Sequence, residues 1–441
     1  MSKTFINHDD TPEQIIHFSV TGDSLIVKRL CKNALPFLEL KNLLTSSDVS
    51  LTNLETSLHR HENDIYPSRT SGGDWVCSVP EILEDLKWLG FNLYSIPNNH
   101  SMDWTHNGLM RTIENLNRAH VAFAGAGRNL SEATAPVYLE TPGGRVALIA
   151  CTTSFEPWHM AGEQRKDCLG RPGVFGLEFE RIINISSSEL SVLENIHARI
   201  SKDDDGWIDD NGLKLFRFGN YLYKLGSGAE ITRVCKHSKD LLKISIEEAR
   251  RQADVVVVSI HSHERKSDNP HIPADFQTDL AHFCIDNGAH AFLAHGPHVI
   301  RGIEVYHGHP IIHGLGNFFY QCELLEKAPA EFYSKFASFD SDARMADVYD
   351  YRVQNGGILG ETNPDYFQSV IITFSLQDGL LKTLRAFPVS LQFNSPRSNK
   401  GTPRLAHDEY AEQILIQLQK LSKAFGTYFE IKNGFAELTL V

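Results

Sequence analysis

The stretch from Phe292 to Tyr320, FLAHGPHVIRGIEVYHGHPIIHGLGNFFY, carries a cluster of histidines separated by glycines and a proline: His295, His298, His307, His309 and His313. The apolar run at 289–294 predicts a short strand. This strand cannot continue through His295-Gly-Pro-His298, because Pro297 lacks an N–H donor and Gly296 favours a turn. Two imidazoles on one tight turn are well placed to hold a metal ion. HxxH also arises by chance among 21 histidines, so the motif alone leaves metal binding open.

The bulk properties of the chain favour a soluble α/β protein and exclude several classes of function. A length of 441 residues exceeds one ordinary core, and 41% hydrophobic with 22% charged residues is typical of globular proteins. A net charge of −13 disfavours nucleic-acid binding. No apolar run is long enough to predict a membrane-spanning helix, and the N-terminal MSKTFINHDDTPEQ lacks the apolar core of a signal peptide. Seven scattered cysteines without a CxxC pair argue against disulfides and against a cysteine zinc site, and predict a cytoplasmic location.

Polar residues that suit metals recur at or near the ends of the predicted strands. Strand 15–20 runs into Asp23, although Gly-Asp is also an ordinary turn. In strand 49–58, Asn53 and Glu55 are two residues apart and therefore share one face. Strand 91–96 leads into Asn98-Asn99-His100, and the β-branched strand 255–260 into His261-Ser-His263. Any one of these could be a plain loop or a core histidine, but the carboxyl edge of an α/β sheet is where ligands bind.

The remaining segments predict one domain over 15–430 with insertions at about 155–250 and 321–366. The loop 122–130 lacks the GxGxxG spacing of a dinucleotide site. The acidic segment 203–210 is expected to be a surface turn, because it lacks EF-hand spacing. We expect an irregular 155–180, a lid or insertion at 321–366, hairpins at 136–152 and 369–389, a terminal strand pair, and helices at 80–90, 108–120, 183–202, 276–288 and 406–424.

Taken in order, the motifs resemble the CapA family of capsule and poly-γ-glutamate synthesis proteins, within the calcineurin-like metallophosphoesterase superfamily. The resemblance rests on Gly22-Asp23, Asn53-Leu-Glu55, Asn98-Asn99-His100 with Asp103 and Gly108, His261, and His295-Gly-Pro-His298. Further matches are Ala124-Gly-Ala-Gly127, Gly170-Arg-Pro-Gly173, Gly314-Leu-Gly-Asn-Phe318 and the segment 421–427. It implies a four-layer α/β/β/α sandwich with insertions, and a metal centre at the carboxyl edges of the sheets.

The resemblance also implies roles for individual residues. The metal ligands would be Asp23, Glu55, Asn99, His261, His295 and His298. His100 would be the general acid, with Asp103 and Asn53 orienting the groups around it. Two departures from the superfamily matter. Its Asp-x-His motif is here Asp23-Ser-Leu25, which removes one ligand, and many relatives have His-Trp-Gly where this chain has His261-Ser-His263. His263 could therefore serve as a substitute ligand or contact the substrate.

Two functions remain open from the sequence. One is a metal-dependent hydrolase that uses one or two ions of Mn, Fe or Zn on an anionic ester or amide, such as a phosphoester or a γ-glutamyl peptide. Arg171 and Arg301 would hold the anion, unless Arg171 only pins its own loop. The other is a non-catalytic accessory protein of polyglutamate or cell-envelope polymer synthesis. Six convergent polar groups are costly to bury without a task, which favours the hydrolase.

Overall fold

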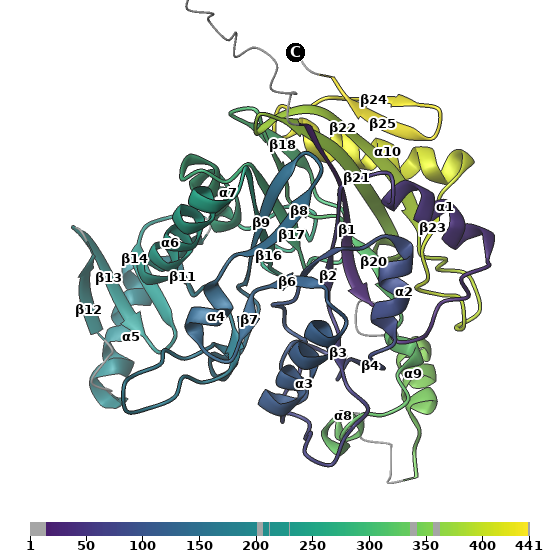
Figure 1. Ribbon diagram of the computed structural model, residues 1–441. Helices are drawn as coiled ribbons and strands as arrows, with labels where there is room; N and C mark the ends of the chain where they lie inside the picture. The colour runs from purple at the N-terminus through teal and green to yellow at the C-terminus, as the bar shows by residue number, and fades with distance from the viewer. Residues whose placement is uncertain are drawn as a thin grey trace, which may run out of the picture.

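The computed structural model describes residues 15–200, 206–210, 212–228, 230–335, 342–355 and 362–439. The polar N-terminal segment and Asp203 to Asp205 lie outside these ranges. Two large β-sheets lie side by side, with helices on their outer faces (Figure 1). The protein is therefore of the mixed α/β class that the alternation of strands and helices predicts.

Strand β16 (Val255–His261) shows how the sequence builds this arrangement. All seven of its residues are buried, as expected for a continuous β-branched run. Alternate side chains point to opposite faces: Val255 and Val257 join the core between the two sheets, whereas Val256, Val258 and Ile260 pack under helices. Covered on both sides, this strand delivers His261 to the edge of the sheet.

The six-stranded sheet has the order β18-β19-β17-β16-β9-β8. Strands β9, β16, β17 and β19 are parallel, so the ends of β16 and β17 meet at one edge, where His261 pairs with His295. The expected hairpin at 136–152 is present as β8 and β9. The strand bounds are Val137–Thr141 (β8), Gly144–Thr152 (β9), Ala291–His295 (β17), Ile303–Tyr306 (β18) and His309–Ile312 (β19).

The ten-stranded sheet has the order β24-β25-β22-β21-β1-β2-β5-β6, with β20 beside β1 and β23 beside β22. Strands β1, β2, β5 and β6 are parallel, and β21 and β22 form the expected hairpin. The strand bounds are Ile15–Leu25 (β1), Val49–Leu54 (β2), Leu93–Ser95 (β5), Ala122–Ala124 (β6), Asn317–Tyr320 (β20), Gln368–Gln377 (β21), Leu380–Ser390 (β22), Arg404–Leu405 (β23), Phe429–Lys432 (β24) and Phe435–Leu438 (β25).

Helices cover the outer face of each sheet. The helices α4 (Leu130–Thr134), α6 (Lys236–Gln252) and α7 (Asp275–Asp286) pack on the six-stranded sheet. The helices α1 (Leu35–Leu44), α2 (Ile82–Leu89) and α3 (Thr105–Arg118) pack on the ten-stranded sheet. Helix α10 (Asp408–Lys423) inserts its apolar side into the core that the two sheets share. The predicted helices at 80–90, 108–120, 276–288 and 406–424 therefore have their counterparts.

The segment 155–250 contains a separate small sheet with the order β12-β13-β14-β11-β15, at the left of Figure 1. The prediction of a helix at 183–202 is wrong at its start, because β11 runs to Ile185 and α5 spans Ser187–Ile200. The expected turn at 203–210 is wrong over 206–210, which pairs with β13 as a strand. The bounds are Gly173–Val174 (β10), Phe179–Ile185 (β11), Gly206–Asp210 (β12), Leu213–Phe218 (β13), Tyr221–Leu225 (β14) and Ile231–Val234 (β15).

The segment 321–366 contains two short helices, α8 (Ala330–Ser334) and α9 (Met345–Gln354), within its described parts. They pack around the buried Trp75 in a core of their own. Within the described residues, no helix has the length and apolarity needed to cross a bilayer. All seven cysteines are free thiols.

Candidate metal centre

The carboxyl ends of the parallel strands bring the predicted polar residues together between the two sheets. Strand β1 does not end at Val20 as expected but continues to Leu25, so that Asp23 lies inside it and pairs with Asn53 and Asn317. A register shift between Val20 and Asp23 marks a bulge. Bulges commonly re-aim a side chain beside a functional site, and this one accompanies the turn of Asp23 toward His261 and His295.

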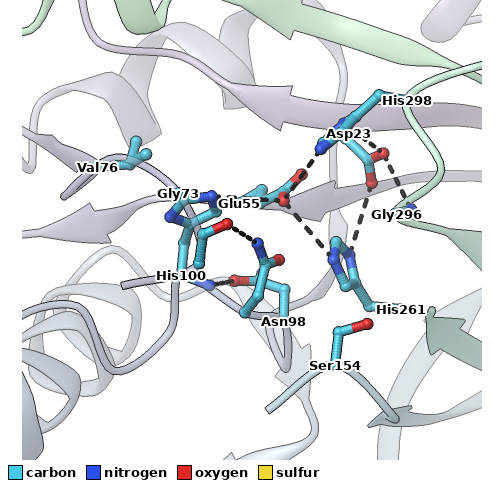
Figure 2. A network of polar contacts seen from close by, with 12 residues as sticks. Asp23, Glu55, Gly73, Val76, Asn98, His100, Ser154, His261, Gly296 and His298 are labelled. Atoms are coloured by element: carbon cyan, nitrogen blue, oxygen red, sulfur yellow. Dashed lines mark hydrogen bonds and ion pairs between the residues drawn. The ribbon is translucent and has the colours of Figure 1, made fainter. Parts of the chain in front are cut away.

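Glu55 lies at the centre of the group, between His100 on one side and His261, His298 and Asp23 on the other (Figure 2). Its Oε1 is 3.6 Å from His261 Nε2, 3.9 Å from His298 Nε2 and 3.9 Å from His100 Nε2. Asp23 Oδ1 is 3.8 Å from Nδ1 of His261 and 3.8 Å from Nδ1 of His295. Two carboxylates and at least three imidazoles therefore converge on one buried point.

The hydrogen bonds around Asp23 hold it in place without using up the site. The Asn53 side-chain amide donates to Asp23 Oδ1 at 2.8 Å and lies 3.1 Å from His261 Nδ1. The backbone N–H of Gly296 donates to Asp23 Oδ2 at 3.0 Å. Gly296 has a φ of +104°, and a Cβ there would lie 2.9 Å from the backbone nitrogen of Ser262. Only glycine fits the turn that brings this donor to the carboxylate.

Several buried polar atoms of the centre have no hydrogen-bond partner among the residues that the structure describes. They are both oxygens of Glu55 and both ring nitrogens of His295; Oδ1 of Asn99, whose side-chain N–H donates to the carbonyl oxygen of Gly72, also lacks a partner. A buried carboxylate with neither oxygen satisfied is costly, and a bound cation removes that cost. Carboxylate, amide oxygen and imidazole are donors that suit Mn, Fe or Zn. The residues present thus fit a divalent transition metal.

The two carboxylates ionise differently in the absence of a cation. Burial raises the pKa of Glu55 well above its usual range, and the charges of Asp23 and Asp103 raise it further. Burial opposes the ionisation of Asp23 too, but contacts with His298, His261 and His295 hold its pKa below the usual range. Burial also lowers the pKa of His261 to about 3, so this ring is neutral and able to bind a metal. A divalent cation would allow both carboxylates to be charged together.

His263, two residues after His261, also lies beside Glu55 and His298. One donor atom each from Glu55, His263 and His298 lies within 4.8 Å of the others, and Asp23, Glu55 and His261 form a second such group. Glu55 belongs to both groups. His263 Nε2 is also 3.0 Å from His261 Nε2. His263 therefore lies close enough to Glu55 and His298 to hold a metal ion with them.

His100 and Asp103 form a hydrogen-bonded pair at the edge of the centre. The Nδ1–H of His100 donates to Asp103 Oδ2 at 2.7 Å, which leaves Nε2 facing Glu55. Burial lowers the pKa of His100, but the charge of Asp103 and this hydrogen bond outweigh burial, and the pKa ends above its usual value. Asp103 is itself held by the backbone N–H groups of Val76 at 2.9 Å and Gly72 at 3.3 Å. The pair can therefore present a proton toward the centre.

The two arginines predicted to hold substrate differ in their surroundings: Arg301 lines a cavity together with His263, whereas Arg171 lies on the surface. Arg301 is fully buried, and its guanidinium donates to the carbonyl oxygens of Pro270 and Glu264 and to Gln277 Oε1. These bonds engage all three nitrogens of the guanidinium and fix its orientation, and a contact of Arg301 with substrate stays a prediction. Arg171 is exposed and donates from Nε to the carbonyl oxygen of Met160 at 3.0 Å. This contact supports the alternative that Arg171 stabilises its own loop, although its two Nη groups remain available to bind an anion.

The sequence analysis gave no role to Asn317 and Asn98, and both support the centre. The Nδ1–H of His298 donates to Asn317 Oδ1 at 2.8 Å, and Asn317 in turn donates to the carbonyl oxygen of Tyr366. This bond leaves Nε2 of His298 free toward Glu55. Asn98 donates to the carbonyl oxygen of Leu54 and accepts from the backbone N–H of His100. Both lie in motifs quoted from the sequence, but only the tertiary structure shows which groups they contact.

Comparison with known proteins identifies relatives along most of the chain. The family model of the bacterial capsule synthesis protein PGA_cap matches residues 17–321. An uncharacterized protein of Sinorhizobium fredii is 34% identical over 423 residues, which is 93% of this chain and 90% of its own length. The capsule biosynthesis protein CapA of Bacillus anthracis is 23% identical over 63% of this chain and 51% of its own length. A Mycobacterium tuberculosis protein named "Probable polyglutamine synthesis accessory protein" is 24% identical over 62% of this chain and 56% of its own length.

Proposed function

This chain belongs to the PGA_cap family of bacterial capsule synthesis proteins, and from that membership and the buried centre we propose that it is a metal-dependent hydrolase of an anionic ester or amide. The observation that carries the proposal is the convergence of Asp23, Glu55 and the histidines, with both Glu55 oxygens unsatisfied. A protein with only a scaffolding role gains nothing from this burial, which costs free energy unless a cation is bound.

The ligands in this proposal are Asp23, Glu55, Asn99, His261, His295 and His298, joined by His263. When bound, a divalent ion would polarise the anionic group of the substrate and make a water molecule easier to deprotonate. The chain's own residues do the rest. Asn53 and Asn317 fix the orientation of Asp23, His261 and His298 through the hydrogen bonds described above.

His100 acts on the leaving group in this proposal. Its Nδ1–H is engaged by Asp103, so the proton that it can give away is the one on Nε2. The raised pKa keeps this proton on the ring at a higher pH than an ordinary histidine would. Asp103 stays hydrogen-bonded to the backbone N–H groups of Val76 and Gly72, so the ring orientation is fixed before substrate arrives.

The finer fold and the substrate class belong to the same proposal. The two sheets with helices on both outer faces fit the four-layer α/β/β/α sandwich of the metallophosphoesterase type, as one domain with insertions at about 155–250 and 321–366. The substrate would be a phosphoester or a γ-glutamyl, peptide-like molecule. The names of the Bacillus anthracis and Mycobacterium tuberculosis relatives point to capsule and poly-amino-acid metabolism.

The test is turnover by purified protein that has been stripped with a chelator and reloaded with Mn²⁺, Fe²⁺ or Zn²⁺. The substrates are aryl phosphomonoesters, aryl phosphodiesters and γ-glutamyl peptides. A hydrolase shows metal-dependent turnover that Glu55→Gln abolishes and that His100→Ala greatly reduces. The matched control is Glu304→Gln, which changes a partly buried carboxyl group paired with His282 and His313.

The second candidate is an accessory role in capsule or poly-γ-glutamate synthesis without catalysis. The observation in its favour is the set of relatives named for such synthesis. Full metal occupancy with no turnover on either class of substrate, in wild type and in His100→Ala alike, would favour this role and reject the hydrolase.

A further inference from the structure

A second group of metal-binding side chains lies outside the candidate centre: His59, His61 and Cys77. The parallel pair β3 (Ser57–Leu58) and β4 (Cys77–Ser78) sets their positions, because Ser57 pairs with Cys77 and the backbone N–H of His59 donates to the carbonyl oxygen of Ser78. One donor atom from each of the three residues lies within 4.8 Å of the others. His59 Nδ1 is 3.5 Å from Cys77 Sγ.

One buried ring nitrogen of this group has no hydrogen-bond partner, and packing fixes the orientation of both imidazole rings. His59 is 1% exposed, and its Nε2 has no hydrogen-bond partner within the part of the chain that the structure describes. Trp104 packs edge-on against both imidazoles, with ring centroids 5.1 Å from His59 and 4.6 Å from His61. His61 has a φ of +57°, in the left-handed region that non-glycine residues seldom adopt. The surrounding packing thus holds three metal-binding side chains together.

The protonation states suit a metal that displaces one proton. Burial lowers the pKa of His59 to about 4, and burial and the charge of Lys327 lower that of His61, so both rings are neutral near pH 7. Burial raises the pKa of Cys77 to about 12, which keeps the free thiol protonated. A bound cation deprotonates a coordinating thiol outright.

The three residues also line a cavity of about 420 Å³, together with Glu326 and Lys327. An ion held by three side chains at the wall of a cavity keeps a coordination position for water or another small ligand. One thiolate and two imidazoles are soft to borderline donors, which favour Zn²⁺ over Mn²⁺ or Mg²⁺.

We propose that His59, His61 and Cys77 form a thiolate-containing Zn²⁺ site that is separate from the buried carboxylate and histidine centre. In the binding step, the Cys77 S–H bond breaks, its proton goes to solvent, and the sulfur forms a bond to the ion. The sequence pattern had argued against a cysteine zinc site, because no CxxC pair is present. The fold supplies instead two histidines from one strand end and one cysteine from the neighbouring strand.

The site would close the loop between β3 and β4. This loop carries Gly72 and Val76, whose backbone N–H groups bond to Asp103, and the carbonyl oxygen of Gly72 accepts from Asn99. Figure 2 shows Val76 and Gly73 beside His100. An ion at the base of the loop would therefore hold in place the backbone groups that bond to Asp103 and Asn99. Asp103 orients the proposed acid His100, and Asn99 is a proposed ligand.

The test uses Co²⁺ as a spectroscopic probe for the zinc site in the full-length, chelator-treated, reduced protein. A cysteine thiolate bound to Co²⁺ gives a sulfur-to-metal charge-transfer absorption in the near ultraviolet, which carboxylates and imidazoles do not give. We expect the wild type to show this band, Cys77→Ser to lose it, and Cys168→Ser, which changes an exposed thiol, to keep it. Glu55→Gln should also keep it, since Glu55 belongs only to the other centre.

A second variant guards against misfolding of Cys77→Ser. His61→Ala changes a partly exposed residue, and it should weaken Co²⁺ binding at the thiolate band by about 10-fold or more while the circular dichroism spectrum stays unchanged. Absence of the band in the wild type, its survival in Cys77→Ser, or unchanged affinity in His61→Ala would each overturn the proposal. Loss of turnover in Glu55→Gln with the band intact concerns only the hydrolase, so the two proposals fail separately.

Discussion

Replacing Glu55 by glutamine should move the stability of the metal-free and the metal-loaded protein in opposite directions. In the metal-free protein, burial and the charge of Asp23 raise the pKa of Glu55, so this group destabilises the fold as the pH rises above the ordinary carboxyl pKa of 4.5. Glutamine cannot ionise and removes that cost. With metal bound, the same substitution removes a ligand and therefore a source of stability.

The size of the second effect follows from linkage. An ion at about 1,000 times its Kd stabilises the native state by about 4.1 kcal/mol, and a roughly 100-fold loss of affinity reduces this to about 1.4 kcal/mol. For a chain of 441 residues, an unfolding entropy of about 2.1 cal/mol/K per residue gives roughly 0.9 kcal/mol/K. The metal-dependent rise in Tm should therefore fall from about 4 °C to about 1.5 °C in Glu55→Gln.

Differential scanning calorimetry with chelator and with a fixed excess of Mn²⁺ measures both effects. Glu304→Gln is the matched control, because Glu304 is a partly buried carboxyl group outside the centre that is hydrogen-bonded to His282 at 2.8 Å. Its Tm should change equally with and without metal. If Glu55→Gln keeps the full metal-dependent rise, or melts lower than wild type in chelator, the assignment of Glu55 as a buried ligand is wrong.

Three further substitutions test the other roles. His100→Ala should keep its metal and lose about 10²–10⁴-fold in kcat. In wild type, His100 loses its acidic proton as the pH rises through its raised pKa, so kcat/KM should fall at high pH. This fall should be absent from the pH profile of the variant. Arg301→Lys should lower Tm with KM unchanged, because a lysine cannot reach all three acceptors that the guanidinium serves, and a raised KM at unchanged Tm would restore a substrate role. Arg171→Lys should lower kcat/KM at constant Tm if this exposed side chain holds the anion. Lower stability with unchanged kinetics would mean that Arg171 only stabilises its own loop through the hydrogen bond to Met160.

The sequence predicts the strand ends well because burial makes their pattern simple. Strand β16 is covered on both faces, so its β-branched run and the histidine at its end can be recognised from the sequence alone. The side chains that support the centre are harder to predict. Asn317 bonds to a histidine 19 residues away, and Asn53 links Asp23 to a histidine 208 residues away, so only the tertiary structure reveals these contacts.

The errors have physical causes as well. The predicted helix begins too early, because the segment 183–185 pairs with β14 and its two isoleucines are β-branched residues that favour strands. The prediction of an isolated acidic turn at 206–210 failed for the same reason, since pairing with β13 outweighs local composition.

The most direct test of the metal centre is an anomalous difference map from crystals grown with Mn²⁺. The account predicts at least one strong peak between the two sheets, with oxygen or nitrogen atoms of Asp23, Glu55 and His261 within about 2.0–2.3 Å of it. A well-ordered map with the ion elsewhere, and none of the seven proposed ligands within that distance, would contradict the account.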